Sequence, residues 1–364
     1  MALTKNGVYE SQLYSVIKER EQDLKKLDGK VIFLSGATGL IGSAFIDLVM
    51  TADEILGINV SVVALSRSKD RAESRFGQYF NNKNFKYVCG DVKDKIDYDG
   101  KADYVIHAAS NTHPAAYALD PVGTIDTNVL GLKNVLDLAV EKKSVRAMFV
   151  SSVEIYGNAL GENDRFSEEY CGYIDCNTLR AGYTESKRLG EALCCAYREK
   201  YGTDIVIPRV SRVFGPTLLK SDTKAMSQFL FKAVNGEDIV LKSEGKQYFS
   251  YCYMLDAASA FIFLLVNGKS GEAYNVSGKD GDITLKNLAE AIANSVNKKV
   301  IFELPSETER KGFSKAARAI LDTEKIENLG FRPVFSLESA IKSTIELLKI
   351  EYNVIKDVIY GAKI

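Results

Sequence analysis

Four side chains in two short segments could together carry out acid–base chemistry on an alcohol. Ser152 and Glu154 lie in "SSVEIYG", which ends an apolar run typical of a buried strand, and Tyr183 and Lys187 lie in "GYTESKRLGE". A spacing of four places Tyr183 and Lys187 on one face of a helix. Lys187 would then favour the ionised form of Tyr183, which could take a proton from a hydroxyl bound by Ser152 while hydride leaves the carbon.

The tyrosine–lysine spacing alone is a weak signal, because it occurs four times in the chain. The other tyrosines with this spacing are Tyr14, Tyr79 and Tyr352. Tyr14 and Tyr352 fall in segments that flank the predicted fold, and Tyr79 falls in a polar segment expected to be a loop. Only Tyr183 begins a predicted helix after the strand that carries Ser152, so this pair is the candidate for catalysis.

A glycine turn predicts where a cofactor binds. The segment "KVIFLSGATGLIGSAFIDLVM" is typical of a strand, a turn and a helix. Glycines in such a turn let the backbone approach a pyrophosphate, and the N-terminus of the following helix supplies N–H groups. The sequence therefore predicts dinucleotide binding. The predicted contacts in the turn are Gly36, Thr38, Gly39, Leu40, Ile41 and Gly42.

The choice between NAD and NADP depends on the end of the second strand. An NAD site usually has an acidic residue there, which accepts hydrogen bonds from the ribose hydroxyls. This chain has Ser66 and Arg67 instead. Arg67 could accommodate a 2′-phosphate, which favours NADP, or it could be a solvated arginine on a loop. Asp91, in "CGDV", is expected near the adenine amino group.

Alternating strands and helices predict the frame that positions these residues. Strand-like runs near residues 31, 60, 86, 103 and 146 alternate with helical stretches, which implies an α/β fold with a Rossmann-type, doubly wound parallel sheet. Beyond residue 216 the spacing changes, which indicates a smaller C-terminal substrate-binding lobe. The expected division is an N-terminal helical extension at 1–29, a dinucleotide-binding domain with the catalytic residues at 30–216, a lobe at 217–350 and a C-terminal tail at 351–364. The extension is expected to contain a helix at 8–27. A strand at 272–278 is a candidate to return from the lobe to the main domain.

Composition argues against several classes of function. The chain has 364 residues, of which 46% are apolar and 26% charged, with a net charge of −1. Neither nucleic acid nor a membrane surface is therefore an expected partner. No apolar run approaches a membrane span and the N-terminus lacks the apolar core of a signal peptide, so we expect a cytoplasmic protein. Six cysteines without CxxC spacing and only two histidines predict no metal site.

Nine motifs occur in a characteristic order over roughly residues 30–345: "GATGLIG", "GDV", "HAAS", "TNVLGLKNVL", "SSVEIYG", "YTESKR", "RVSRVFGP", "YCYMLDAASA" and "GEAYNV". Together they resemble the extended short-chain dehydrogenase/reductase family, which contains nucleotide-sugar epimerases, dehydratases and decarboxylases. The resemblance implies a retained nicotinamide cofactor, a triad of Ser152, Tyr183 and Lys187, and a lobe that grips a nucleotide diphosphate sugar. It also allows a homodimer, and it matches Asn128 to an asparagine that opens a helix near the active site. Further cofactor contacts implied in this way are Val92, Ala108, Ala109, Ser110, Asn128, Ser151, Tyr183 and Lys187.

Glu154 reduces the number of reactions that the resemblance implies. Simple 4-epimerases of the family usually have small or neutral residues in the two positions after the triad serine or threonine. Dehydratases and sugar-acid decarboxylases usually have glutamate at the second position, and some dehydratases add aspartate at the first. This chain has Val153 and then Glu154. A carboxylate there could remove the C5 proton of a 4-keto sugar; the structural alternative is a glutamate that binds backbone N–H groups or Arg180.

Two positions depart from the family pattern. Arg212 stands where sugar-nucleotide enzymes commonly have asparagine, and Phe249 stands where they commonly have an arginine that clamps the pyrophosphate. Loss of a charge-assisted contact should weaken diphosphate binding unless another cation replaces it. The candidate replacements are Arg212, Lys220, Lys242 and Lys246, and the alternative is an unusual substrate.

The sequence therefore predicts an NAD(P)-dependent nucleotide-sugar epimerase or dehydratase in which Tyr183 acts at a sugar hydroxyl, O4, and Glu154 acts on the ketone. A decarboxylase of the UDP-glucuronate type and an NADPH-dependent ketosugar reductase remain alternatives. A non-catalytic dinucleotide sensor is the alternative from another class. The nucleotide, the sugar and the product stereochemistry stay open. The predicted substrate contacts are Thr112, Glu154, Arg212, Lys246 and Phe249.

Overall fold

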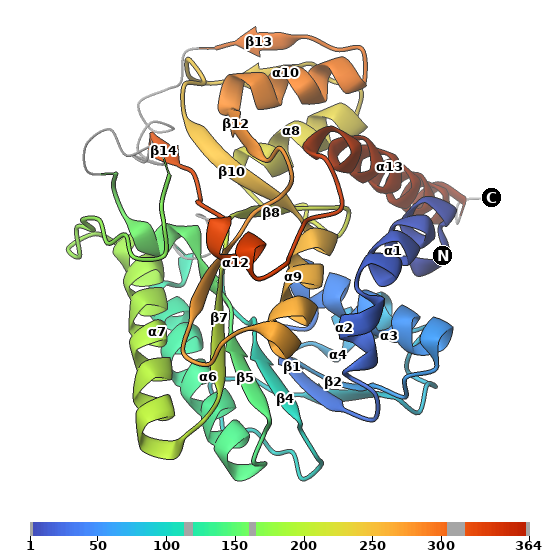
Figure 1. The fold of residues 1–364 in the computed structure, drawn as a ribbon. Coiled ribbons are helices and arrows are strands. Elements are labelled where there is room, and N and C mark those ends of the chain that lie inside the picture. Colours follow the sequence, from blue (N-terminus) through green and yellow to red (C-terminus); the bar gives the residue numbers. More distant parts are fainter. Residues whose placement is uncertain (1–2, 113–118, 160–164, 304–316, 362–364) are drawn as a thin grey trace.

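The computed structural model of the chain describes residues 3–112, 119–159, 165–303 and 317–361, the last eleven as backbone alone. Its central element is a parallel sheet (Figure 1) with the strand order β11-β7-β5-β4-β1-β2-β3 and with β6 paired to β7. The strand order reverses between β1 and β4, the point at which doubly wound sheets bind ligands. The strands are β1 (Val31–Ser35), β2 (Ser61–Ser66), β3 (Phe85–Cys89), β4 (Tyr104–His107), β5 (Arg146–Phe149), β6 (Ser151–Ser152), β7 (Ile205–Val210) and β11 (Ala273–Val276); β6 leads into the 3₁₀ turn η2 (Val153–Tyr156).

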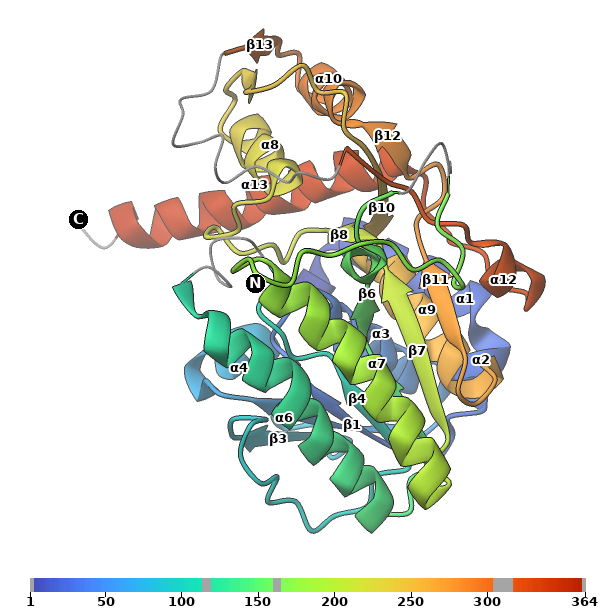
Figure 2. The ribbon, with the colours of Figure 1, turned by 90° about the vertical axis from the view of Figure 1, so that its left-hand side faces the viewer.

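Helices cover both faces of this sheet, so its strands are apolar on both sides. Along β1, Ile32 and Leu34 enter one buried cluster and Phe33 enters another. Helices α6 and α7 lie side by side on one face, whereas α3 and α9 cover the other (Figures 1 and 2). The helices of this part are α3 (Leu40–Leu56), α4 (Lys69–Phe76), α6 (Pro121–Glu141), α7 (Ala181–Tyr201) and α9 (Met254–Asn267).

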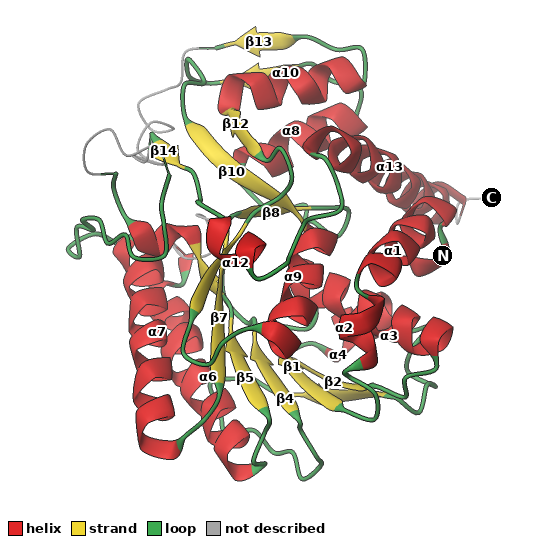
Figure 3. Ribbon diagram, in the orientation of Figure 1, coloured by secondary structure: helices red, strands yellow, loops and turns green. Residues whose placement is uncertain are grey.

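A smaller lobe stands beyond the carboxyl ends of the main strands (Figure 3). Its sheet has the order β12-β10-β14, with β8 paired to β10, and β13 pairs with β9. After the first lobe segments the chain passes back into the main sheet, where β11 pairs with β7. The lobe elements are β8 (Arg212–Phe214), α8 (Ala225–Val234), β9 (Ile239–Leu241), β10 (Tyr248–Tyr253), β12 (Asp282–Thr284), α10 (Leu285–Ser295), β13 (Val300–Phe302), β14 (Arg318–Ala319) and α12 (Glu324–Asn328).

The N-terminal extension forms two helices where one was predicted. After a short 3₁₀ turn, η1 (Leu3–Lys5), helix α1 (Gly7–Glu19) ends at Arg20 and α2 (Glu21–Lys25) follows. The break is stabilised because the Arg20 guanidinium lies over Phe263 and Phe331, with distances to the ring centroids of 5.4 and 5.0 Å.

The first and last long helices, α1 and α13, pack against each other. The amide of Gln12 on α1 donates to the hydroxyl of Ser343 on α13 at 2.8 Å. Helix α13 spans Leu337–Gly361, so the tail boundary placed at residue 350 falls inside a helix. Among the described residues, none of the helices combines the length and apolar character that a membrane crossing requires.

Candidate active site

The glycine turn between β1 and α3 lies directly against the end of β4. Gly36 has a φ of +73°, and a Cβ there would stand 2.5 Å from the backbone nitrogen of Ala109 and 2.6 Å from the carbonyl carbon of Ala108. A Cβ on Gly42 would stand 2.4 Å from the carbonyl oxygen of Gly36. Glycine is therefore required here by backbone conformation and by the close approach of three chain segments.

The same turn fits a dinucleotide cofactor. Gly39 is the N-cap of α3 and is exposed, so the first N–H groups of the helix are open to an anion. A pyrophosphate would be held there by backbone N–H groups and by the positive end of the helix dipole. The other predicted contacts around the turn are half-buried at its rim: Thr38, Leu40, Ile41, Ala108, Ala109 and Ser110.

The predicted adenosine contacts lie at the ends of β2 and β3. The hydroxyl of Tyr87 donates to the carbonyl oxygen of Ser66 at 2.9 Å and lies 3.4 Å from the Ser66 hydroxyl. Arg67 is exposed at the next position. Asp91 accepts a hydrogen bond from the backbone N–H of Lys93 at 3.0 Å. Preference for NADP through Arg67 stays a prediction.

The three triad residues lie where β6 meets α7. The Ser152 hydroxyl caps η2 by accepting from the backbone N–H of Glu154 at 3.2 Å, and α7 packs against both β6 and η2. The Lys187 Nζ donates to the carbonyl oxygen of Val150 at 2.8 Å. Tyr183 lies one turn earlier on the same face of α7 and is buried.

Burial dominates the electrostatics beneath the triad. It lowers the pKa of Lys187 to about 7, against the opposing effect of the Glu191 carboxylate. Burial, with the charge of Lys187 as a second cause, lowers the pKa of His107 to about 3. His107 is therefore neutral; its Nδ1 lies 2.9 Å from the hydroxyl of Ser35 and its ring stacks on Phe149. His107 is therefore a buried packing residue at the end of β4.

Asn128 was expected to open a helix, and this expectation was wrong. Helix α6 begins earlier, because Asp120 caps it and Pro121 occupies its first turn. Asn128 is buried in the middle of α6, where its Nδ2 donates to the hydroxyl of Ser186 at 2.8 Å. Ser186 in turn donates to the carbonyl oxygen of Tyr183 at 2.9 Å. Asn128 thus connects α6 to α7 next to Tyr183.

Glu154 is held between two arginines. Its Oε1 lies 3.2 Å from Nη2 of Arg212, and its Oε2 lies 3.5 Å from Nη2 of Arg180. The pairing with Arg180 is the structural alternative that the sequence suggested. The pairing with Arg212 was not foreseen, because Arg212 was predicted only as a substrate contact.

Arg212 lies on Phe249. Strand β8 pairs with β10 so that Arg212 stands opposite Tyr251, and the Arg212 guanidinium carbon lies 3.6 Å from the ring centroid of Phe249. Phe249 itself is 6% exposed. Within the described part of the chain, the buried Nη1 of Arg212 has no hydrogen-bond partner.

Ser151 was predicted to contact the cofactor, but its hydroxyl is directed at helix α7. It donates to Oε1 of Glu191 at 2.5 Å, and Glu191 pairs with Arg209 through contacts of 2.6 and 3.0 Å. Arg209 also donates to the hydroxyl of Tyr156 at 3.1 Å. Sequence reasoning missed this network, which ties β6, β7 and α7 together around the triad. The available signal was the spacing of four between Lys187 and Glu191 on one helix face.

Three other predicted contacts lie in different surroundings. Val92 is buried against α6, and the side chain of Asn134 donates to its carbonyl oxygen at 3.0 Å. Thr112 is exposed beyond the end of β4. The Lys246 side chain is 85% exposed and its Nζ lies 2.5 Å from Glu244, so it is directed at solvent.

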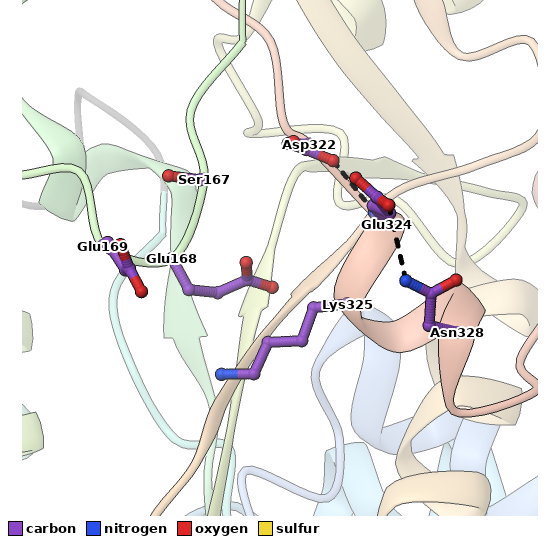
Figure 4. Close-up of a pocket in the computed structure, with 7 residues that line it drawn as sticks. All are labelled: Ser167, Glu168, Glu169, Asp322, Glu324, Lys325 and Asn328. Atoms are coloured by element: carbon purple, nitrogen blue, oxygen red, sulfur yellow. Dashed lines mark hydrogen bonds between the residues drawn. The ribbon is translucent and has the colours of Figure 1, made fainter.

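A separate pocket of about 310 Å³ has an unsuitable charge for a nucleotide diphosphate. It lies between the loop at 167–169 and α12 (Figure 4). Four carboxylates line it, and its lysine, Lys325, is paired with Glu272 at 2.6 Å. Since like charges repel, we do not assign the substrate to this pocket. Its lining residues are Ser167, Glu168, Glu169, Asp322, Glu324, Lys325 and Asn328.

Comparison with known proteins agrees with this geometry. The sequence model described as the NAD dependent epimerase/dehydratase family matches residues 32–277. UDP-glucuronic acid decarboxylase 3 of Arabidopsis thaliana is 28% identical over 331 residues, which cover 89% of this chain and 90% of that protein.

Two solved structures share the fold. One is dTDP-glucose 4,6-dehydratase from Bacillus anthracis in complex with NAD, with a TM-score of 0.74 and 20% identity over 89% of this chain and 98% of that one. The other is UDP-glucuronic acid 4-epimerase from Bacillus cereus in complex with UDP-glucuronic acid and NAD, with a TM-score of 0.74 and 19% identity over 88% and 100%. Both confirm the predicted Rossmann-type fold with its smaller lobe. The family model covers more than half of the sequence, and the chain belongs to the NAD dependent epimerase/dehydratase family.

Proposed function

We propose that the protein converts a nucleotide-linked sugar without net consumption of its cofactor. The observation that carries this proposal is that α7, which bears Tyr183 and Lys187, packs against β6, whose last residue is Ser152, at the edge of the parallel sheet that also carries the glycine turn. A dinucleotide sensor needs the turn, but it has no need of a lysine whose burial disfavours its charge. Chemistry at a hydroxyl next to the cofactor accounts for the whole set.

Each residue then has a role at the O4 hydroxyl of the sugar. Ser152 would hydrogen-bond this hydroxyl and Tyr183 would take its proton, while Lys187, when protonated, would favour the ionised tyrosine. A bound NAD would accept hydride from the sugar carbon and later return it. Glu154, two residues beyond Ser152, would act as acid or base at the neighbouring C5 position.

Among reactions that begin with a 4-ketone, decarboxylation of a sugar acid has the most support. The relative from Arabidopsis thaliana is a UDP-glucuronic acid decarboxylase by name, and two arginines lie at Glu154. In a 4-keto sugar acid, the C5–C6 bond breaks and its electron pair passes into an enolate. The carboxylate leaves as CO₂, and C5 then takes up a proton. Val153 argues against dehydration by an aspartate–glutamate pair.

Product analysis tests the proposal. The purified protein would be examined by mass spectrometry for retained NAD or NADP and then incubated separately with UDP-glucuronic acid and UDP-glucose. We expect release of CO₂ from UDP-glucuronic acid, with the cofactor in its original oxidation state at the end. Epimerised UDP-glucuronic acid would support the epimerase alternative. Stoichiometric loss of NADPH with a keto sugar, or dinucleotide binding without any product, would overturn the proposal in favour of a reductase or a sensor.

A further inference from the structure

Arg212 combines three features of a ligand-binding residue: a fixed position, a free donor and closeness to the triad. We infer that Arg212 binds a carboxylate on the sugar, and that Phe249 and Glu154 position its guanidinium for this purpose. The inference deepens the proposed function and rests on it, because it takes O4 as the reacting hydroxyl.

The position of Arg212 is fixed from two directions. Its guanidinium stacks on the ring of Phe249 at 3.6 Å, and its Nη2 pairs with Glu154 at 3.2 Å. A guanidinium that stacks on an aromatic face keeps its in-plane N–H groups directed outward. Phe249 therefore restricts the plane of the group, and Glu154 restricts its rotation within that plane.

The contacts of Arg212 with Phe249 and Glu154 leave one of its N–H donor groups unused. Nη1 of Arg212 is buried and, within the described residues, lacks a hydrogen-bond partner, whereas the Arg212 side chain as a whole is 18% exposed. A buried charged donor without a partner is unfavourable, and an incoming anion would remove that penalty. The unused group is thus suited to an oxyanion that arrives with the substrate.

The chemistry of a hexose decides which oxyanion can reach it. The diphosphate is carried on C1, which lies across the ring from C4, whereas C6 is attached to C5, the neighbour of C4. Arg212 contacts Glu154, whose backbone N–H is bound by the Ser152 hydroxyl. Because Ser152 is assigned to O4, the anion nearest to Arg212 is a carboxylate at C6.

Binding measurements that isolate the C6 carboxylate test this assignment. UDP-glucuronic acid and UDP-glucose differ only at C6, so the ratio of their dissociation constants reports the carboxylate whatever nucleotide the protein prefers. We expect the wild-type protein to bind UDP-glucuronic acid about ten- to hundredfold more tightly. Arg212→Gln should bring the ratio close to one while the affinity for UDP-glucose changes less than about twofold.

Three further variants separate charge from positioning. Arg212→Lys keeps the charge but lacks the planar fork, so it should restore only part of the preference. Phe249→Leu removes the stacking surface and should reduce the preference by less than Arg212→Gln does. Glu154→Gln should lower kcat through its acid–base role while changing the binding ratio only a few-fold, because an amide oxygen still accepts from Nη2.

Arg318→Gln is the matched control. The Arg318 guanidinium lies over the ring of Tyr248, 5.2 Å from its centroid. Tyr248 precedes Phe249 on β10, so the two rings lie on opposite faces of that strand. Removal of the Arg318 guanidinium should leave the ratio unchanged. Thermal unfolding of every variant would confirm that each one folds.

The possible failures can be told apart. An equal loss of affinity for both sugar nucleotides in Arg212→Gln would assign Arg212 to the diphosphate. Equal affinities of the wild-type protein for the two sugar nucleotides would exclude a carboxylate site. Either result overturns the inference. Because these assays measure binding, they stay valid if turnover fails. A carboxylate preference without any product would overturn the proposed function alone.

Discussion

The glycine turn and the Arg212 cluster, defined as Arg212, Glu154 and Phe249, contrast in how they are built. At the turn, backbone groups would face a bound cofactor, and Gly36 is required because a Cβ would collide with the backbone of Ala109. In the Arg212 cluster, side chains from separate elements orient one another. The comparison teaches that the shape of the turn is determined by chain geometry, whereas the shape of the cluster depends on a few exchangeable side chains.

The largest expected effect is at Tyr183, which belongs to neither of these two regions. Tyr183→Phe should lower kcat about 10²- to 10⁴-fold, because it removes the group that accepts the proton. The retained dinucleotide should remain, since the backbone of the glycine turn is unaltered. Turnover assays and mass spectrometry of the purified variant measure both quantities. Unchanged turnover would refute the triad assignment. Loss of the cofactor would show that cofactor binding depends on the Tyr183 side chain as well as on the glycine turn.

A second prediction tests whether the glycine turn is limited by space as well as by conformation. Gly36→Ala should lower the free energy of unfolding by about 2–4 kcal/mol, because it adds a steric clash to the strain of a positive φ. It should also release the cofactor. Urea denaturation gives the stability, and mass spectrometry gives the cofactor content.

Gly57→Ala is the control for that experiment. Gly57 ends α3 with a φ of +63° but has no atom within 4 Å of its ideal Cβ, so the substitution should cost only about 1 kcal/mol. Equal losses in the two variants would show that conformation alone accounts for the requirement at Gly36.

A third prediction concerns the pH dependence of stability. The pKa of Lys187 is about 7 in the folded protein and close to 10.5 in an unfolded chain. Between these values the unfolded chain binds the additional proton, so stability rises with pH, by up to about 1.4 kcal/mol per pH unit. Below pH 7 Lys187 is protonated in both states, so the full cost of burying its charge lowers the stability. Lys187→Met should therefore remove this rise, as measured by urea denaturation of the cofactor-free protein between pH 7 and 9; parallel curves for the two proteins would contradict the assignment.

The same contrast explains how far the sequence could predict the molecule. The turn at Gly36 and the pair Tyr183–Lys187 follow local rules of backbone conformation and helix spacing, and both were placed correctly on their elements. The contact between Arg212 and Phe249 arises only when β8 pairs with β10. A single sequence does not specify such a pairing, so the two positions were recognised as departures but not as partners.

Other errors came from local signals that were given too little weight. The start of α6 at Pro121 was indicated by the aspartate and proline that precede Asn128. Tyr79 does lie in a turn after α4, as expected, but its burial was not anticipated, and its hydroxyl donates to Asp47 at 3.1 Å. This contact depends on the packing of α3 against the segment after α4, which local composition does not reveal.

The smallest expected effect lies at the adenosine end of the cofactor site, where the predicted contact comes from a side chain and not from the backbone. Arg67 is exposed next to Ser66, at a position where an NAD site usually has an acidic residue. If Arg67 contacts a 2′-phosphate, Arg67→Ala should weaken NADP binding about three- to tenfold and leave NAD binding unchanged, because an exposed charge-assisted contact contributes modestly. Arg71→Ala removes the same charge from the exposed surface of α4 and should affect neither cofactor. Titration of the cofactor-free wild-type protein and both variants with each dinucleotide measures these affinities. A loss of NADP affinity in both variants would reflect general electrostatic attraction, whereas no loss in either would make Arg67 a solvated arginine and leave NAD as the cofactor that this turn accepts.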